Sequence, residues 1–201
     1  MAHFSLSPQD SRHAAVACAP ENILPYFTIM AEIINQNKIP FDLTLKKVSF
    51  GKSGSVESPN LSGLKHQWFD YLPNTFAWPV MSERLREIID YHASGDEQYE
   101  WIRVNINSET SGFRRYFMLR FKKQNDVLDL EKSVFHKLIN KPKFLVNPAF
   151  SQEKIANLCV FGRPDDMFWQ IPSGIYVSRQ VWEDARRKGL AGLHFENARI
   201  F

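Results

Sequence analysis

Cysteine is scarce in this sequence, and long hydrophobic runs are missing from it. Cys18 and Cys159 are the only cysteines, so the chain cannot build a disulfide framework or a four-cysteine zinc site, and a reducing compartment is expected. No apolar run approaches the roughly 18 residues of a membrane-spanning helix. The apolar stretch 14–19 is also shorter than the roughly 7–15 residues of a secretion-signal core. We therefore expect a cytoplasmic protein with no membrane contact.

A strong excess of either charge is missing as well. The chain has 25 Lys and Arg against 22 Asp and Glu, a net charge of +3, whereas proteins that bind nucleic acid without sequence preference usually concentrate more basic charge. Hydrophobic residues make up 44% of the chain and include 16 Phe and 5 Trp, which is more than a disordered chain carries. A length of 201 residues suits one domain, or one domain with a modest extension.

Catalytic and metal-binding motifs are absent too. His-x-x-x-His, Cys-x-x-Cys and EF-hand patterns do not occur, and neither does the Gly-x-Ser-x-Gly elbow of serine hydrolases. Cys159 lies in an apolar run without a nearby cation, which is typical of a buried structural cysteine. We therefore predict no enzyme activity, no metal and no cofactor. The six histidines make no pair at metal-ligand spacing: His3, His13, His66, His92, His136 and His194.

The end of the chain carries the most informative pattern, which reads as strand, helix and strand. Residues 175–177 are rich in β-formers, and Ser178 is placed to accept a backbone N–H as a helix N-cap. The helix ends at Gly189 after a basic last turn, and Leu193 and Phe195, two apart, indicate a returning strand. The unit contains no nucleophile and no acid–base pair, so it indicates a scaffold. The apolar positions of its helix are Val181, Trp182 and Ala185.

The rest of the chain reads as helices and strands joined by turns. Apolar spacing predicts a helix over residues 25–37, and Ser82 is placed to cap a second helix. Turn residues join two strands, 101–106 and 116–121, into a predicted antiparallel hairpin. Further strands are predicted at 41–45 and 144–146. The apolar positions are Phe27, Met30, Ile33 and Ile34 in the first helix, and Leu85, Ile88 and Ile89 in the second.

Three segments show no clear strand or helix pattern. Residues 1–20 read as a loose leader, residues 51–63 as a loop rich in Gly, Ser and Pro, and residues 126–131 as a turn that leads into a helix at Ser133. Taken with the predicted elements, this favours an α+β fold, in which helices pack on a mainly antiparallel sheet within a single domain. The predicted division is into a variable N-terminal segment, residues 1–65, and an α+β domain, residues 66–201.

One loop, residues 161–169, combines aromatic and charged side chains in a way that suits contact with a partner protein. Arg163, Asp165 and Asp166 have no structural duty visible in the sequence, and Trp169 supplies an aromatic anchor. Burial of Phe168 and Trp169 in the core is the open alternative. The two aspartates also form a carboxylate pair, but no third ligand or partner histidine accompanies them, so a surface loop is favoured over a metal or acid–base site.

A basic strand provides the competing interpretation, a nucleic-acid-binding module. Its basic residues are Arg114, Arg115, Arg120, Lys122 and Lys123, interleaved with aromatic residues. Alternation along a strand divides these residues between the two faces of the sheet. A solvated strand with basic ends is therefore favoured over a platform on which bases stack.

Three segments of the sequence together resemble one known family. They are residues 78–87 with the preceding Asp70, residues 116–119 with residues 126–129 and Ser133, and residues 175–195. These segments are similar to the immunity proteins of bacterial polymorphic toxin systems, specifically the large family numbered eleven. The resemblance extends over roughly residues 66–195.

The resemblance implies an inhibitor that is encoded beside a secreted toxin and protects the producing cell by binding that toxin. It brings no catalytic residues, and it implies that the shared motifs are scaffold. Contacts with the cognate toxin are then expected from loops that leave the sheet, with residues 1–65 as the other candidate region. The predicted partner-binding residues are Arg163, Asp165, Asp166 and Trp169.

Overall fold

Two sheets form the body of the protein. The computed structural model describes residues 2–9, 13–36, 38–51, 54–136, 144–164 and 167–201. The larger sheet contains, in spatial order, β2 (His13–Cys18), β3 (Leu43–Gly51), β6 (Tyr99–Ser108), β7 (Gly112–Phe121) and β5 (Val80–Met81), and β4 (Gly54–Ser58) pairs with β3 outside this order. The smaller sheet contains β10 (Val160–Gly162), β11 (Ile175–Ser178), β1 (His3–Pro8) and β12 (Leu193–Asn197). A separate pair consists of β8 (Val134–His136) and β9 (Phe144–Asn147).

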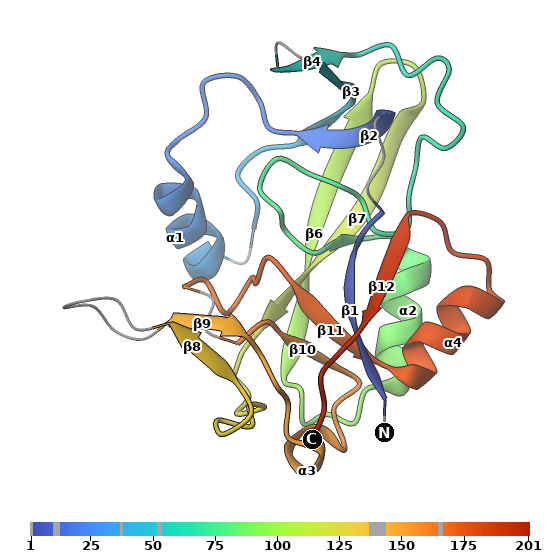
Figure 1. The fold of residues 1–201 in the computed structure, drawn as a ribbon. Helices are drawn as coiled ribbons and strands as arrows, with labels where there is room; N and C mark the ends of the chain where they lie inside the picture. Colours follow the sequence, from blue (N-terminus) through green and yellow to red (C-terminus); the bar gives the residue numbers. More distant parts are fainter. Residues whose placement is uncertain (1, 10–12, 37, 52–53, 137–143, 165–166) are drawn as a thin grey trace.

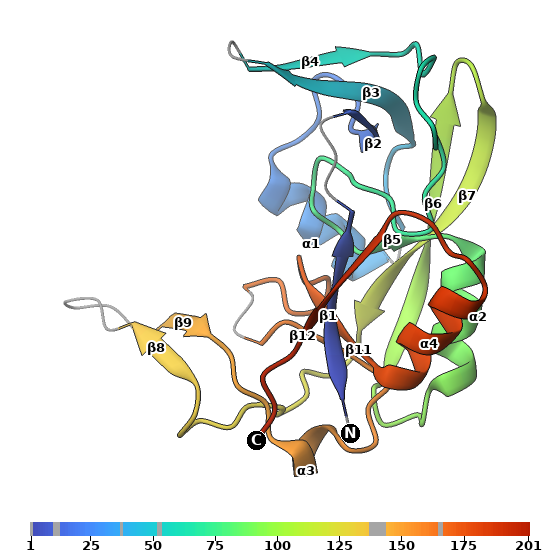
Figure 2. The ribbon, with the colours of Figure 1, turned by 45° about the vertical axis from the view of Figure 1, so that its right-hand side comes forward.

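The helices pack at different places on these sheets. The helix α1 (Tyr26–Gln36) lies on the opposite side of the molecule from α2 (Glu83–His92) and α4 (Arg179–Arg187), which lie side by side (Figures 1 and 2). The helix α2 contacts β7 of the larger sheet, and α4 contacts β1 and β11 of the smaller sheet. The pair of helices therefore joins the two sheets. A single-turn helix, α3 (Gln152–Ile155), precedes β10.

Each packed layer has its own hydrophobic core. The first core lies between α1 and the larger sheet, the second encloses α2 and α4 together with strands of both sheets, and the third lies around Phe150 and Phe161. Burial of these apolar side chains is the main favourable term in folding. Representative buried residues are Ile29, Ile33, Leu43, Trp78 and Val104 in the first core, and Leu6, Leu85, Ile89, Val177 and Val181 in the second.

The structure confirms the α+β class and the mainly antiparallel pairing. The only parallel pair between the described strands is β3 with β6. It also confirms the first predicted helix, which is α1 over Tyr26–Gln36, the strand at 144–146 and the hairpin, in which β6 and β7 pair over their whole length. Both predicted caps are present, because the Oγ of Ser82 accepts from the Leu85 N–H at 3.3 Å and the Oγ of Ser178 accepts from the Val181 N–H at 3.5 Å.

The prediction that residues 1–20 form a loose leader is wrong. The strand β1 lies between β11 and β12 in the smaller sheet, with His3 and Leu6 buried, and β2 pairs with β3 in the larger sheet. The Nε2–H of His3 donates to the carbonyl of Leu158 at 2.7 Å. Ser and Pro interrupt the strand pattern locally, but pairing with the far end of the chain stabilises it. In space, residues 1–65 contribute strands to both sheets; their variability between relatives stays a prediction.

Two further predictions are wrong. The strand β4 forms within the predicted loop 51–63, because it pairs with β3 in register from Lys47 opposite Ser58 to Gly51 opposite Gly54. No helix starts at Ser133; the strand β8 follows it. The Oγ of Ser133 donates to the carbonyl of Ala149 at 3.1 Å and accepts from its N–H at 3.0 Å. These bonds to Ala149 hold Ser133 in place before the extended backbone of β8, so the Ser133 side chain does not cap a helix.

Candidate partner-binding surface

The predicted contact loop connects β10 to β11. The N–H of Arg163 donates to the carbonyl of Gly174 at 2.8 Å, which closes the base of the loop, and the Arg163 side chain is exposed. Trp169 is half-buried and packs against the second core, and Phe168 is half-buried against the first core. Asp165 and Asp166 lie outside the described residues.

Backbone contacts attach this loop to the larger sheet. The N–H of Phe121, at the end of β7, donates to the carbonyl of Gln170 at 2.7 Å. At the start of the loop, a Cβ on Gly162 would lie 2.9 Å from the Pro172 Cγ and 3.2 Å from the Phe121 ring. Gly162 is thus required by close approach of its neighbours, and the loop is held between the two sheets.

The structure brings Arg163 and Trp169 together at the base of the loop. Both residues line a pocket of about 20 Å³, which they share with Phe121 and Gly162. A pocket of this size is close to the space of a single water molecule and does not accept a substrate. At this pocket Arg163 is exposed and Trp169 is half-buried, and the space between them is too small for a substrate.

Where the loop meets α1, Phe27 and Met167 expose apolar side chains, each next in the sequence to a half-buried ring, Tyr26 and Phe168 respectively. We call these four residues the apolar patch. Phe27 is 64% exposed and Met167 is 71% exposed. The Phe168 ring centroid lies 5.7 Å from that of Phe27 and 5.3 Å from that of Tyr26, in an edge-to-face arrangement with Tyr26. Exposed apolar groups beside packed aromatic rings make this region a candidate surface for contact with another protein.

The sequence pattern of α1 did not identify Phe27 as a surface residue. Helical spacing groups Phe27 with Met30, Ile33 and Ile34, but the structure buries Ile29, Met30 and Ile33 and directs Phe27 outward. The rotation of α1 about its axis depends on its packing against the sheet, which the spacing does not contain. The only sequence signal for this surface is that Phe27 stands at the edge of the apolar face of α1 that packs on the sheet.

Most basic residues of the strand that suggested nucleic-acid binding make contacts within the protein. Arg120 is buried; its guanidinium is paired with Glu100 and donates to the carbonyls of Ile33 and Ile34. Lys122 pairs with the same Glu100 carboxylate at 3.0 Å. The predicted division of the basic residues between two faces is confirmed, because Arg114 opposes Ile106 on one face and Arg115 opposes Asn105 on the other.

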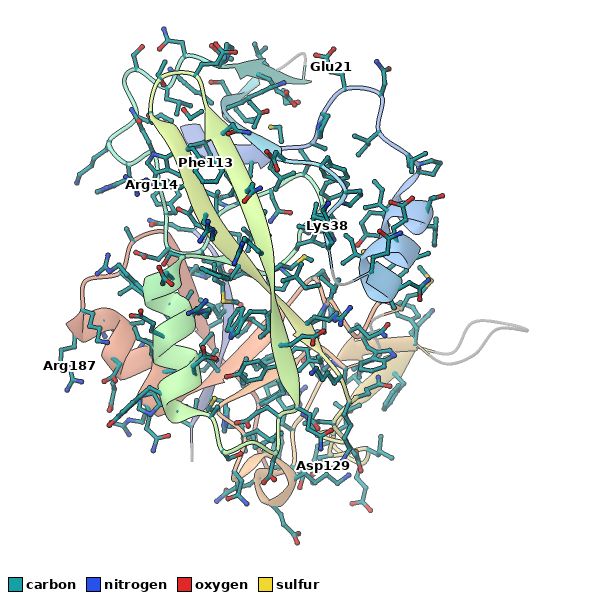
Figure 3. All side chains as sticks on the ribbon, turned by 180° about the vertical axis from the view of Figure 1, so that it is seen from behind. Glu21, Lys38, Phe113, Arg114, Asp129 and Arg187 are labelled. Carbon is teal, nitrogen blue, oxygen red and sulfur yellow. The ribbon has the colours of Figure 1, made fainter. Side chains whose placement is uncertain are left out.

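The exposed end of the same strand holds the remaining arginines. Phe113 and Arg114 lie at the tip of the β6–β7 hairpin (Figure 3). The Arg114 guanidinium lies 4.8 Å from the centroid of the Trp68 ring, as a cation–π contact. The basic charge is therefore spread between a buried pair, a stacked arginine and the exposed Arg115, rather than gathered into one stripe that follows a phosphate backbone.

Titratable groups outside the loop are engaged structurally. Burial raises the pKa of the Cys18 thiol to about 11 and also raises the pKa of Cys159 above its ordinary value, so both thiols stay protonated. Asp126 pairs with Lys154 at 2.8 Å, and Asp129 accepts from two backbone N–H groups in a turn, as predicted.

Within the described residues, no three His, Cys, Asp or Glu side chains lie close enough to hold a metal ion. No helix of the described part is long and apolar enough to cross a membrane.

Comparison with the sequence models of known families identifies a family for this chain. The sequence model of a family described as "Immunity protein family (Imm11)" matches residues 33–199, which is most of the chain. The match begins earlier than the predicted resemblance and includes part of α1, although it starts after Phe27. A search of curated proteins finds no significant match.

Proposed function

This chain belongs to the Imm11 immunity protein family, and we propose that it protects its producing cell by binding one cognate toxin domain in the cytoplasm and neutralising it, without catalysis of its own. The toxin is proposed to be the product of the neighbouring gene. Family membership supports the immunity function, and the exposed apolar patch supports a contact with another protein. Membranes and nucleic acids have no part in this proposal.

The single observation that carries the proposed contact is the exposure of Phe27, beside the predicted loop, and of Met167, within it. Both side chains expose apolar surface, and the Phe27 ring is packed against the rings of Tyr26 and Phe168, so little conformational entropy is lost when a partner covers Phe27. Aromatic anchors surrounded by polar and charged residues are typical of the centre of a protein–protein interface. We propose that Phe27 and Met167 join the predicted contact residues, which are Arg163, Asp165, Asp166 and Trp169.

Coexpression with the product of the adjacent gene tests the function. We expect the adjacent toxin domain to stop growth when expressed alone, and this chain to restore growth and to co-purify with the toxin as a stoichiometric complex. A Ser178→Ala variant, altered only at a helix cap, should protect cells as the wild type does. Absence of both protection and complex formation would remove the proposed function.

A further inference from the structure

A second surface lies on the opposite side of the molecule from the apolar patch, between α4 and β12 (Figures 1 and 2). The helix α4 covers β11 and β1 but leaves the face of β12 open, which creates a groove with a volume of about 670 Å³. The floor of the groove is aromatic, and its rim is basic. The residues that carry the argument are Phe4, Trp182 and Phe195 on the floor, and Arg179 and Arg186 on the rim. His194 also lines the groove, where it pairs with Glu196 at 3.1 Å.

The aromatic floor is held in place by contacts between its own rings. Phe4 stacks on Trp182 with ring centroids 4.9 Å apart and planes 20° apart, and it meets Phe195 edge-on at 6.4 Å. All three rings are half-buried. Because they come from three different elements, β1, α4 and β12, the floor is rigid and presents preformed apolar surface to a ligand.

One wall of the groove is a strand with a free edge. The strand β12 is the last in its sheet, and β1 is its only partner among the described strands. The bonds from the Ala198 N–H to the His3 carbonyl and from the Gln9 N–H to the Gly192 carbonyl fix which residues of β12 face β1. By the alternation of an antiparallel pair, the backbone groups of Leu193, Phe195 and Asn197 point away from β1. The same three residues line the groove.

The charge of the groove indicates the chemistry of its ligand. The Arg186 guanidinium lies 5.0 Å from the Trp182 ring centroid, and it pairs with no carboxylate of the described residues. Arg179 is also on the rim, although Glu183 holds it at 2.8 Å. Among the residues that line the groove there are two arginines and no carboxylate. A second copy of this chain would bring these arginines toward their own counterparts, whereas an acidic partner would complement them.

We propose that the free edge of β12 binds an extended acidic segment of a partner protein by strand addition. The segment pairs with the outward backbone groups of Leu193, Phe195 and Asn197, its apolar side chains cover the aromatic floor, and a carboxylate pairs with Arg186. This site is separate from the proposed toxin contact at Phe27 and Met167. Failure of either proposal leaves the other intact.

A peptide with capped ends tests this proposal, with full-length protein and fluorescence anisotropy as the readout. The probe has eight residues, with Val and Glu sharing the odd positions and Thr at the even positions, so that apolar and acidic side chains lie on the same face of the added strand. Two peptides serve as controls: one replaces Glu by Lys, and one carries N-methyl groups on alternate residues, which block pairing with a strand edge. We expect binding of the first peptide only, with amide shifts in β12 and in the Trp182 indole by NMR.

A matched pair of variants distinguishes the groove from general electrostatics. Arg186→Glu changes the charge in the groove, and Arg187→Glu makes the same change one residue away, outside the groove, where the exposed Arg187 side chain pairs with Asp184 at 2.7 Å (Figure 3). Both residues are exposed, so both variants should fold, which circular dichroism checks. We expect Arg186→Glu to weaken binding of the acidic peptide by about tenfold or more and Arg187→Glu to weaken it much less.

Three outcomes would overturn the proposal. Equal binding of the N-methylated peptide would exclude strand addition. Equal loss in the two variants, or no binding of the acidic peptide at all, would exclude a specific acidic ligand. A dimer in light scattering that Arg186→Glu abolishes or strengthens would show that a second copy of the chain occupies the groove.

Discussion

Phe69 packs against Gly192 so closely that a Cβ at Gly192 would lie 2.3 Å from the Cβ of Phe69. Gly192 also has a φ of +77°, which favours glycine. The neighbouring residues are bonded in both directions: the Asp70 N–H donates to the Ala191 carbonyl and the Ala191 N–H donates to Oδ2 of Asp70, each at 2.8 Å. These contacts join residues 69–70 to residues 191–192; Asp70 and residues 191–192 belong to two of the segments that carry the family resemblance. The identities of Asp70 and Gly192 therefore have a structural explanation that needs no partner protein.

Replacement of Gly192 by Ala should destabilise the protein by about 2–4 kcal/mol, from overpacking against Phe69 together with backbone strain. Gly189 provides the control, because its φ is +62° but no atom lies within 4 Å of an added Cβ. Gly189→Ala should cost only about 1–2 kcal/mol. Urea unfolding of the two variants measures the difference. An equal loss in both would show that Phe69 moves aside and that the contact with Gly192 is soft.

Asp70→Ala should also be strongly destabilising. Asp70 is buried; its Oδ1 accepts from the Ser82 hydroxyl at 2.6 Å, and its Oδ2 accepts from the Ala191 N–H at 2.8 Å. Removal of the carboxylate leaves both donors without this acceptor, at about 1–3 kcal/mol each. The midpoint of urea unfolding checks this. A midpoint within error of the wild type would mean that water replaces the carboxylate.

The two serine caps should differ in their contribution to stability. The Ser82 hydroxyl both caps α2 and donates to Asp70, whereas the Ser178 hydroxyl caps α4 through a longer bond of 3.5 Å. Ser178→Ala should cost about 1 kcal/mol through the lost cap, and Ser82→Ala should cost more than this, because a buried bond to a carboxylate is lost as well. Melting temperatures of the two variants compare the losses. A larger loss at Ser178 would contradict the assignment.

The local signals in the sequence predicted the local structure well. Caps at Ser82 and Ser178, the turn between β6 and β7, and alternation along those strands each depend on residues a few positions apart, and all are present. The position of β1 depends instead on pairing between residues 3–8 and residues 175–197. No spacing within residues 1–20 contains that information, so the sequence indicated a leader where there is a central strand.

The surface was predicted less well than the fold for a related reason. Whether a side chain such as Phe27 faces solvent depends on how α1 is rotated against the larger sheet, and this follows from the packing of Ile29 and Ile33. Composition identified the loop that ends at Trp169 as a mixture suited to contact, but the helix beside it was read as core. Which side chains a partner protein contacts depends on the surface of that partner, and no pattern within this chain specifies it.

Glu97 should make the protein sensitive to acid. Burial acts to raise the pKa of Glu97, but hydrogen bonds from the Cys159 N–H at 2.7 Å and from residues 94 and 95 outweigh it and lower the pKa below its ordinary value of 4.5. A lowered pKa in the folded state contributes stability above pH 4.5, and this contribution is lost as the pH falls through the folded-state value.

The free energy of unfolding should therefore fall below about pH 4.5 more steeply in the wild type than in Glu97→Gln. Glu109→Gln removes an exposed carboxylate and is the matched control. Urea unfolding between pH 3 and pH 7 compares the three proteins, with the pH range chosen to span the titration of carboxylates, about 3–5. Parallel curves for the wild type and Glu97→Gln would show that Glu97 does not contribute to the acid transition.

The proposed toxin contact predicts a separation between binding and stability. Phe27→Ala, Met167→Ala and Arg163→Ala each remove an exposed side chain, so the free energy of unfolding should change by less than about 0.5 kcal/mol. Affinity for the toxin should fall by about 1–3 kcal/mol at those positions that the toxin covers. Ser178→Ala should show the opposite behaviour, with lower stability and unchanged affinity of the folded protein.

Calorimetric titration of the toxin domain into each variant, together with its melting temperature, distinguishes the two classes. Loss of affinity at Phe27 and Met167 but not at Arg163 would place the centre of the interface on the apolar patch, where packed rings exclude water, with the loop as its rim. The reverse pattern would place it at the base of the loop beside Trp169. Normal affinity in all three variants would show that the toxin does not bind at the apolar patch or the loop. A toxin that covers any part of the patch must remove water from Phe27 or Met167, and truncation of those side chains would then change the affinity.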